Sequence, residues 1–274
     1  LPHGTPGDSP PSDLPPAGPD DGDPNGPVVE APGVPCGSNA SLFGLTATNV
    51  NIGGRDVHVA YPCNKRAGAP VTFVLNLHGT MPSEDLKLYQ VAYFSVNNHA
   101  DSHNIITAAP KAVGSQWGNG DGGVDLPHIM EVIDWVYTTF ADFDIRAMWI
   151  AGHSWGAMYS TNLVCDPTLA DKVRGAVLQS GSGTPPACAG NLSVISSAAE
   201  MDIGPVINQG ATAAAHGCGA EQTNMVGNNT ETHWPGCNPG FVHANYVMLG
   251  KGHSDYMDAV VVERIADLIN EARP

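Results

Sequence analysis

The chain has 274 residues, 42% of them hydrophobic, which is enough to bury a large core. Its 11 basic and 27 acidic residues give a formal net charge of −16 at neutral pH. This charge argues against nucleic acid and anionic membranes as partners, because both are bound through basic patches that the sequence lacks. No apolar run approaches the ~20 residues that a membrane-spanning helix needs.

The first 35 residues differ from the rest of the chain in composition. They contain 11 of the 23 prolines and 6 of the 27 acidic residues but no Lys or Arg. Such a segment buries too little apolar surface to offset the entropy of folding. We therefore predict a disordered Pro/Asp-rich tail or linker over residues 1–35 and one folded domain over residues 36–274. The chain begins at Leu1 without a leader, so we expect a mature secreted form.

The folded part alternates between strand and helix patterns. Residues 45–61 alternate apolar and polar residues around Gly53-Gly54, which is typical of an antiparallel hairpin. Short Val- and Ile-rich runs then predict buried parallel strands, separated by segments with helical spacing. The order indicates an α/β fold with a doubly wound, mostly parallel sheet and an N-terminal antiparallel hairpin. The expected strands are 71–77, 104–109, 147–151, 175–180, 192–198 and 245–249, and the expected helices are about 84–100, 125–140, 155–165, 204–215 and 254–272.

A glycine-flanked serine follows the strand over residues 147–151. The pentapeptide Gly152-His153-Ser154-Trp155-Gly156 fits the pattern G-x-S-x-G and leads into a helical segment. A strand that turns sharply into a helix needs small residues beside the turn, and the turning residue points its side chain out of the sheet. This context favours Ser154 as a nucleophile at the positive end of a helix.

A serine hydroxyl is a weak nucleophile and requires a base that an acid orients. In this kind of sheet the partners follow the serine in the order acid, then histidine. His253 comes directly after the last expected strand. Glu200 and Asp202 both follow the strand over residues 192–198, and we choose Asp202 because it lies farther along, where a loop can carry it to the histidine. Acyl transfer also needs two oxyanion donors, which we expect from the backbone N–H groups of Trp155 and Thr80.

Four motifs resemble the secreted polyhydroxybutyrate depolymerase and feruloyl esterase branch of the α/β-hydrolases: NLHGT, GSQWGNGDGGVD, GHSWGAM and GKGHSDYMD. The resemblance covers roughly residues 45–272 and implies the α/β-hydrolase fold, with Ser154, Asp202 and His253 as a catalytic triad. The branch commonly has Gly-Leu-Ser-Ala-Gly-Gly, and the chain departs from it at His153, Trp155 and Ala157. These departures leave the substrate open. Polyester hydrolases of the cutinase and PET-degrading kind also place a bulky residue beside the serine and are a close alternative.

The connection between the strands over 175–180 and 192–198 is only about a dozen residues long, so we expect a lidless site. An open site beside aromatic residues would stack on an aromatic acyl group or a polymer segment. Simple core packing is an equal alternative for Trp234. The residues that we assign to substrate binding are His78, Trp117, His153, Trp234 and Tyr256.

Six cysteines without a C-x-x-C pair favour structural disulfides in an oxidising compartment. Nearest-neighbour closure predicts the pairs Cys36–Cys63, Cys165–Cys188 and Cys218–Cys237. Two patterns suggest metal sites but lack a key ligand. His99 and His103 have zinc-helix spacing without the Glu of that motif, and the segment starting at Asp21 has Pro32 where a calcium loop needs Glu. We expect no metal and no cofactor.

The sequence therefore predicts a secreted, extracellular, monomeric serine esterase. Its expected substrates are polyesters of the hydroxybutyrate or terephthalate type, or feruloyl and aryl esters, cleaved through an acyl-enzyme. Two alternatives remain open. One is a serine peptidase or thioesterase that uses the same residues, and the other is a catalytically silent binding domain of the same fold on an acidic linker.

Overall fold

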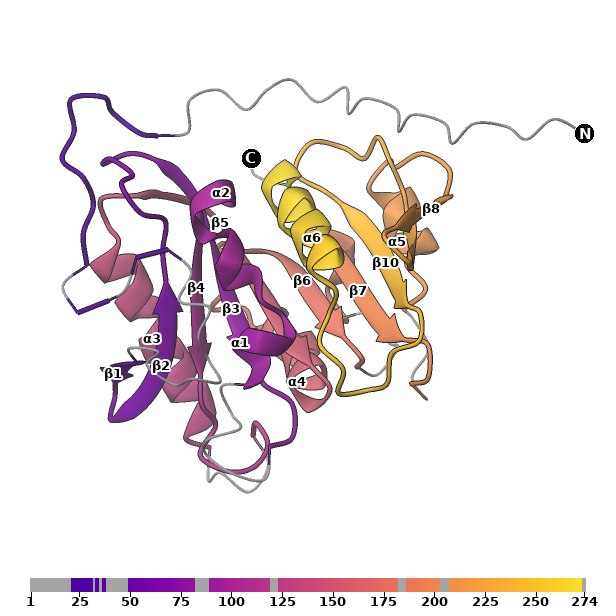
Figure 1. Cartoon of the computed structure of the whole chain (residues 1–274), viewed down its shortest axis with the longest axis horizontal. Coiled ribbons are helices and arrows are strands. Elements are labelled where there is room, and N and C mark those ends of the chain that lie inside the picture. The colour runs from indigo at the N-terminus through magenta and orange to yellow at the C-terminus, as the bar shows by residue number, and fades with distance from the viewer. Residues whose placement is uncertain are drawn as a thin grey trace, which may run out of the picture.

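The computed structural model describes residues 21–31, 33–34, 36–37, 49–81, 89–118, 123–181, 186–202 and 207–272. In this part of the chain ten strands form one sheet in the order β1-β2-β4-β3-β5-β6-β7-β10-β9-β8 (Figure 1). The central strands from β4 to β10 are parallel, and antiparallel hairpins extend both edges. The predicted α/β-hydrolase fold is thus confirmed. The strands are β1 Asn49–Ile52, β2 Arg55–Ala60, β3 Pro70–Leu77, β4 Ile105–Pro110, β5 Asp144–His153, β6 Val173–Gln179, β7 Ser193–Ala199, β8 Gln222–Val226, β9 Asn229–His233 and β10 His243–Met248.

Helices cover both faces of the sheet (Figure 1). Successive residues of a strand point to opposite faces. Phe73 and Leu75 of β3 share a core with α3 and α4, whereas Val74 shares the core on the other face with α1 and α6. Burial of both faces explains why these strands are continuous apolar runs. The helices are α1 Tyr89–Tyr93, η2 Val96–His99, α2 Ala100–His103, α3 Asp125–Thr139, α4 Trp155–Leu163, η3 Ala189–Asn191, α5 Gly210–Ala215 and α6 Ala259–Glu271. Within the described residues, none has the length and apolar character needed to cross a bilayer.

The two edge hairpins differ in how far the sequence predicts them. The predicted hairpin forms β1 and β2, with positive φ at both turn glycines, Gly53 and Gly54; its residues 45–48 lie outside the described residues. The hairpin β8–β9 was not predicted. Most residues of β8 are exposed, so this strand lacks the apolar alternation that marks a half-buried strand.

Three of the predicted helices are wrong in extent. The helix expected over residues 84–100 is replaced by the short helices α1, η2 and α2, and its residues 84–88 lie outside the described residues. The helical backbone breaks at Ser95, whose φ is −76° and ψ is 39°, between α1 and η2. The helix expected over residues 204–215 begins at Gly210 as α5, and its residues 204–206 lie outside the described residues. The helix expected over residues 254–272 begins at Ala259 as α6.

The described part of the predicted tail packs on the folded domain. Val29 and Ala31 are buried in the core on the α3 side of the sheet. Val28 forms a β-bridge with Arg66, and Asp21 forms an ion pair with Lys65. The tail boundary at residue 35 is therefore wrong for residues 21–31, because a few apolar residues and backbone hydrogen bonds secure a segment whose proline content suggested disorder. Residues 1–20 lie outside the described residues.

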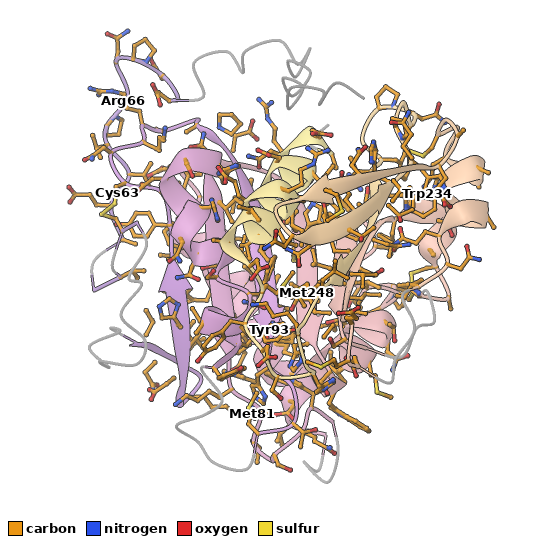
Figure 2. The ribbon with its side chains drawn as sticks, turned by 45° about the vertical axis from the view of Figure 1, so that its right-hand side comes forward. Cys63, Arg66, Met81, Tyr93, Trp234 and Met248 are labelled. Carbon is orange, nitrogen blue, oxygen red and sulfur yellow. A yellow bond between two sulfur atoms is a disulfide. The ribbon has the colours of Figure 1, made fainter. Side chains whose placement is uncertain are left out.

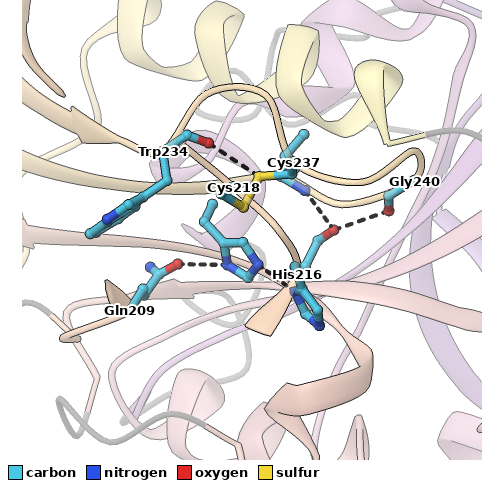
Figure 3. The surroundings of a disulfide bond; sticks show 9 residues. Gln209, His216, Cys218, Trp234, Cys237 and Gly240 are labelled. Atoms are coloured by element: carbon cyan, nitrogen blue, oxygen red, sulfur yellow. Dashed lines mark hydrogen bonds between the residues drawn. A yellow bond between two sulfur atoms is a disulfide. The ribbon is translucent and has the colours of Figure 1, made fainter. Parts of the chain in front are cut away.

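All three predicted disulfides are present. Cys36–Cys63 links the N-terminal segment to the connection between β2 and β3. Cys165–Cys188 links the end of α4 to the segment before β7. Cys218–Cys237 closes the region between α5 and β10, where His216 lies nearby (Figure 3).

Candidate active site

Ser154 occupies the turn between β5 and α4 in a backbone conformation that few residues adopt. Its φ is 52° and its ψ is −117°. The flanking glycines make this turn possible. A Cβ at Gly152 would overlap the backbone of Gly156, and a Cβ at Gly156 would overlap the carbonyl oxygens of Leu77 and His78. The tight approach of α4 to the sheet thus exposes the serine side chain at the carboxyl end of β5.

Three side chains from distant parts of the chain form a hydrogen-bonded series at this edge. His253 Nε2 lies 2.9 Å from Ser154 Oγ, and His253 Nδ1 lies 2.9 Å from Asp202 Oδ2. The Asp202 side chain is 5% exposed, whereas that of His253 is 43% exposed. Because a carboxylate only accepts hydrogen bonds, Nδ1 carries the ring proton and Nε2 faces the serine as an acceptor.

The acid and the histidine follow neighbouring parallel strands, β7 and β10. The strand pairing continues beyond both strands, because the Glu200 N–H donates to the Met248 carbonyl and the Met201 N–H donates to the Lys251 carbonyl. Glu200, the alternative acid, instead accepts a hydrogen bond from the Gly250 N–H at 2.7 Å. The geometry therefore places Asp202, and not Glu200, against the histidine.

The loop after β3 lies directly beside the serine. A Cβ at Gly79 would be 3.1 Å from the Ser154 Cβ, which is tighter than an ordinary contact, so a larger residue here would require the neighbouring atoms to shift. Thr80 lines the same cavity as Ser154. Trp155 is the first residue of α4, and N–H groups of the first helical turn have no partner within the helix. Both predicted oxyanion donors thus belong to segments next to the serine.

Two residues predicted to bind substrate are buried beneath this loop. His78 is fully buried; its Nε2 accepts from the Ala112 N–H, so its Nδ1 carries the proton and donates to the Gly79 carbonyl. Trp117 is 1% exposed, and its Nε1 donates to the His78 carbonyl at 2.8 Å. The Trp155 indole in turn donates to the Trp117 carbonyl at 2.9 Å. These side chains support the loop and do not line the cavity.

Trp234 was also predicted to bind substrate, and the structure places it elsewhere. It is 7% exposed and lies after β9, far from Met81 at the edge of the cavity (Figure 2). Trp234 lines a separate groove between the β8–β9 hairpin and α6. The core-packing alternative therefore fits Trp234 better, because the hairpin that the sequence did not reveal carries it away from the serine.

The cavity at the serine has a volume of about 370 Å³ and combines predicted and unpredicted residues. Tyr256 stands at its border, with its ring stacked 5.0 Å from that of Tyr89. The Tyr89 hydroxyl donates to the Ser254 carbonyl. Met81, Tyr89 and Ser254 were not predicted: no motif marks Met81 or Tyr89, and Ser254 lies in the motif GKGHSDYMD without a role assigned to it. The lining residues are Thr80, Met81, Tyr89, His153, Ser154, His253 and Ser254.

Within the described residues, no group of three or more His, Cys, Asp or Glu side chains is arranged to hold a metal ion. At the cavity itself, a serine hydroxyl lies within hydrogen-bond distance of an imidazole.

No protein-family model matches the chain, and no curated protein is similar to it in sequence. Solved structures with a similar fold include serine hydrolases and esterases. A truncated carbohydrate esterase from gut microbiota has a TM-score of 0.51 at 11% identity, over 82% of this chain and 94% of that one. The Staphylococcus aureus fluorophosphonate-binding serine hydrolase FphF has a TM-score of 0.49 at 16% identity, over 80% of this chain and 94% of that one. The ferulic acid complex of Est1E from Butyrivibrio proteoclasticus has a TM-score of 0.44 at 15% identity, over 82% and 97% of the two chains. At such identities these comparisons concern the fold alone.

Proposed function

We propose that the protein is a serine hydrolase of carboxylic esters. The observation that carries this proposal is the hydrogen-bonded series from Ser154 through His253 to Asp202. His253 Nε2 takes the proton of the serine hydroxyl, and Oγ attacks the ester carbonyl carbon. The imidazolium then protonates the leaving alcohol as the C–O bond breaks. A water molecule deprotonated by His253 attacks the acyl-enzyme and releases the carboxylic acid.

The Thr80 and Trp155 backbone N–H groups are proposed to hold the oxyanion of both tetrahedral intermediates. Loss of one such donor typically costs ~10²–10³ in turnover. The helix that begins at Trp155 adds the positive end of its dipole to the same position.

For the substrate, we propose an ester with an aryl group, such as feruloyl, or with a short hydroxyacyl group of a polyester. Support comes from the size of the cavity and from its walls, where the Tyr89 ring and the Met81 side chain offer apolar contact to a flat acyl group. The three disulfides favour an extracellular location, and we propose that the protein is secreted and acts as a monomer.

Labelling with a fluorophosphonate reagent tests the nucleophile, because such reagents modify a serine that a neighbouring base activates. We expect mass spectrometry to find the adduct on Ser154 of the wild type. Hydrolysis of p-nitrophenyl acetate should fall by up to ~10⁶ in Ser154→Ala. Ser102→Ala, a change at an exposed serine, is the matched control and should keep full activity. More than a tenth of wild-type activity in Ser154→Ala would overturn the assignment.

A panel of feruloyl, hydroxybutyrate and terephthalate esters then identifies the acyl group. The panel also includes a thioester and a peptide amide. Faster turnover of either one than of every oxygen ester would assign the site to a thioesterase or a peptidase. An absence of both labelling and turnover would identify a silent binding domain.

A further inference from the structure

His153 is the last residue of β5 and immediately precedes the serine. Its side chain is 3% exposed, although it lines the floor of the cavity. Its Nε2 lies 2.8 Å from the backbone carbonyl oxygen of His253. The ring is held between two others, with centroid distances of 4.0 Å to Tyr93 and 4.9 Å to His253.

The protonation of this ring is fixed by its surroundings. A carbonyl oxygen only accepts, so His153 Nε2 must carry the proton that joins it to His253. Burial lowers the pKa of His153 to about 4, which keeps the ring neutral at pH 7 and leaves Nδ1 unprotonated. Nδ1 is buried and has no hydrogen-bond partner among the described residues. The one donor of the ring is therefore used inside the protein and is not available to a substrate.

The loop that carries His253 is held at its two ends, because the Met201 N–H donates to the Lys251 carbonyl and the Met257 N–H donates to the Tyr93 carbonyl. Residues 253–256 are exposed. In the described part of the chain, two hydrogen bonds join their backbone to other parts of the site: His153 donates to the His253 carbonyl, and the Tyr89 hydroxyl donates to the Ser254 carbonyl. Because His153 and Ser154 are adjacent in the chain, the first bond ties the loop to the strand that carries the serine.

We infer that His153 is a positioning residue, which holds the backbone of His253 so that its imidazole stays within hydrogen-bond distance of Ser154. This inference rests on the proposed function. It replaces the prediction that His153 binds substrate, and it gives a reason for a bulky hydrogen-bond donor beside the serine. Loss of a positioning residue lowers kcat because it misaligns the base, and it leaves substrate binding unchanged.

Two variants separate the donor from the bulk of the ring. His153→Leu fills the site but cannot donate, whereas His153→Gln keeps an N–H donor that reaches to a similar distance. For p-nitrophenyl acetate we expect His153→Leu to lower kcat ~30- to 100-fold with KM within about twofold, as for a misplaced catalytic group. His153→Gln should stay within about fivefold of the wild type. An increase in KM with unchanged kcat would identify a substrate contact and overturn the inference, and so would equal kcat in both variants.

Backbone hydrogen exchange followed by mass spectrometry tests the same contact without turnover. Peptides covering residues 249–258 should exchange faster in His153→Leu than in the wild type, and His153→Gln should restore the slower rate. Equal exchange in all three proteins would overturn the inference even if the enzyme is active. If the wild type neither turns over esters nor reacts with fluorophosphonate, the proposed function fails while the exchange result still reports on the contact. If His153→Leu does not fold, His153→Asn replaces it, because its amide is one methylene too short to reach the carbonyl.

Discussion

His253 Nδ1 lies 2.9 Å from Asp202 Oδ2, and the two residues follow neighbouring strands whose last paired residues are Met248 and Ala199. The two loops therefore leave the sheet at the same level. The distance between acid and base is set by the register of β7 and β10, and the serine approaches this pair from β5.

Asp202→Asn should lower kcat by ~10³–10⁴ while the fold is kept, because an amide no longer fixes the His253 tautomer that leaves Nε2 free to accept a proton. Glu200→Gln is the matched control, since Glu200 contacts the Gly250 N–H and not the histidine. Steady-state hydrolysis of p-nitrophenyl acetate measures kcat for both variants. A larger loss in Glu200→Gln than in Asp202→Asn would contradict the assignment of the acid.

Gly156→Ala should destabilise the fold by about 3 kcal/mol, because the new methyl group overlaps the Leu77 and His78 carbonyls at the end of β3, which is a central strand of the sheet. Gly190→Ala provides the comparison, since a Cβ at Gly190 meets open space. Denaturant unfolding measures the free energy of unfolding of both variants. Equal stability would show that α4 does not pack on β3 as closely as described.

His58→Phe should reduce the sensitivity of the fold to acid. His58 is 1% exposed, and burial lowers its pKa from 6.5 to about 4. The unfolded chain therefore takes up a proton below pH 6.5 that the folded chain refuses until about pH 4. His58 therefore leaves the free energy of unfolding unchanged above pH 6.5 and lowers it progressively as the pH falls from 6.5 towards 4. Between pH 7 and pH 4.5 the wild type should lose about 2 to 3 kcal/mol more than the variant in denaturant unfolding. Equal losses would be evidence against the burial of this imidazole.

The double variant Cys165→Ala with Cys188→Ala should lower the free energy of unfolding by about 3 kcal/mol, since the disulfide closes a segment with a sequence separation of 23. Activity at 25 °C should persist, because neither cysteine lines the cavity. Thermal unfolding of the oxidised proteins measures the first effect and ester hydrolysis the second. An unchanged melting temperature would mean that the loop is restrained without the disulfide.

The parts of the fold that the sequence predicts are those in which local pattern and burial agree. The strands β3, β5 and β6 are buried on both faces, and their apolar runs make them recognisable. The turn at Ser154 is recognisable because close packing of a helix on a strand admits only glycine at Gly152 and Gly156. Nearest-neighbour pairing of the cysteines succeeds because each disulfide joins positions that are close in the sequence, with separations of 27, 23 and 19.

The remaining features depend on tertiary contacts that no local pattern carries. The β8–β9 hairpin is exposed, so its strands lack apolar alternation. Trp117 and Trp234 are aromatic residues of the kind that lines substrate grooves, but burial decides their role, and both are buried. Tyr89 reaches the cavity only because its short helix packs against the loop after β10, a contact between residues that are distant in the sequence.

The series of hydrogen bonds from the Trp155 indole to the Trp117 carbonyl, and from the Trp117 indole to the His78 carbonyl, couples two segments that the chain keeps well apart. One begins α4, and the other leads from β3 to Thr80. We expect these two bonds to keep the spacing between the Trp155 and Thr80 backbone N–H groups, the proposed oxyanion donors, when either segment moves. The Trp117 and Trp155 side chains thus connect the two segments through their indole N–H groups.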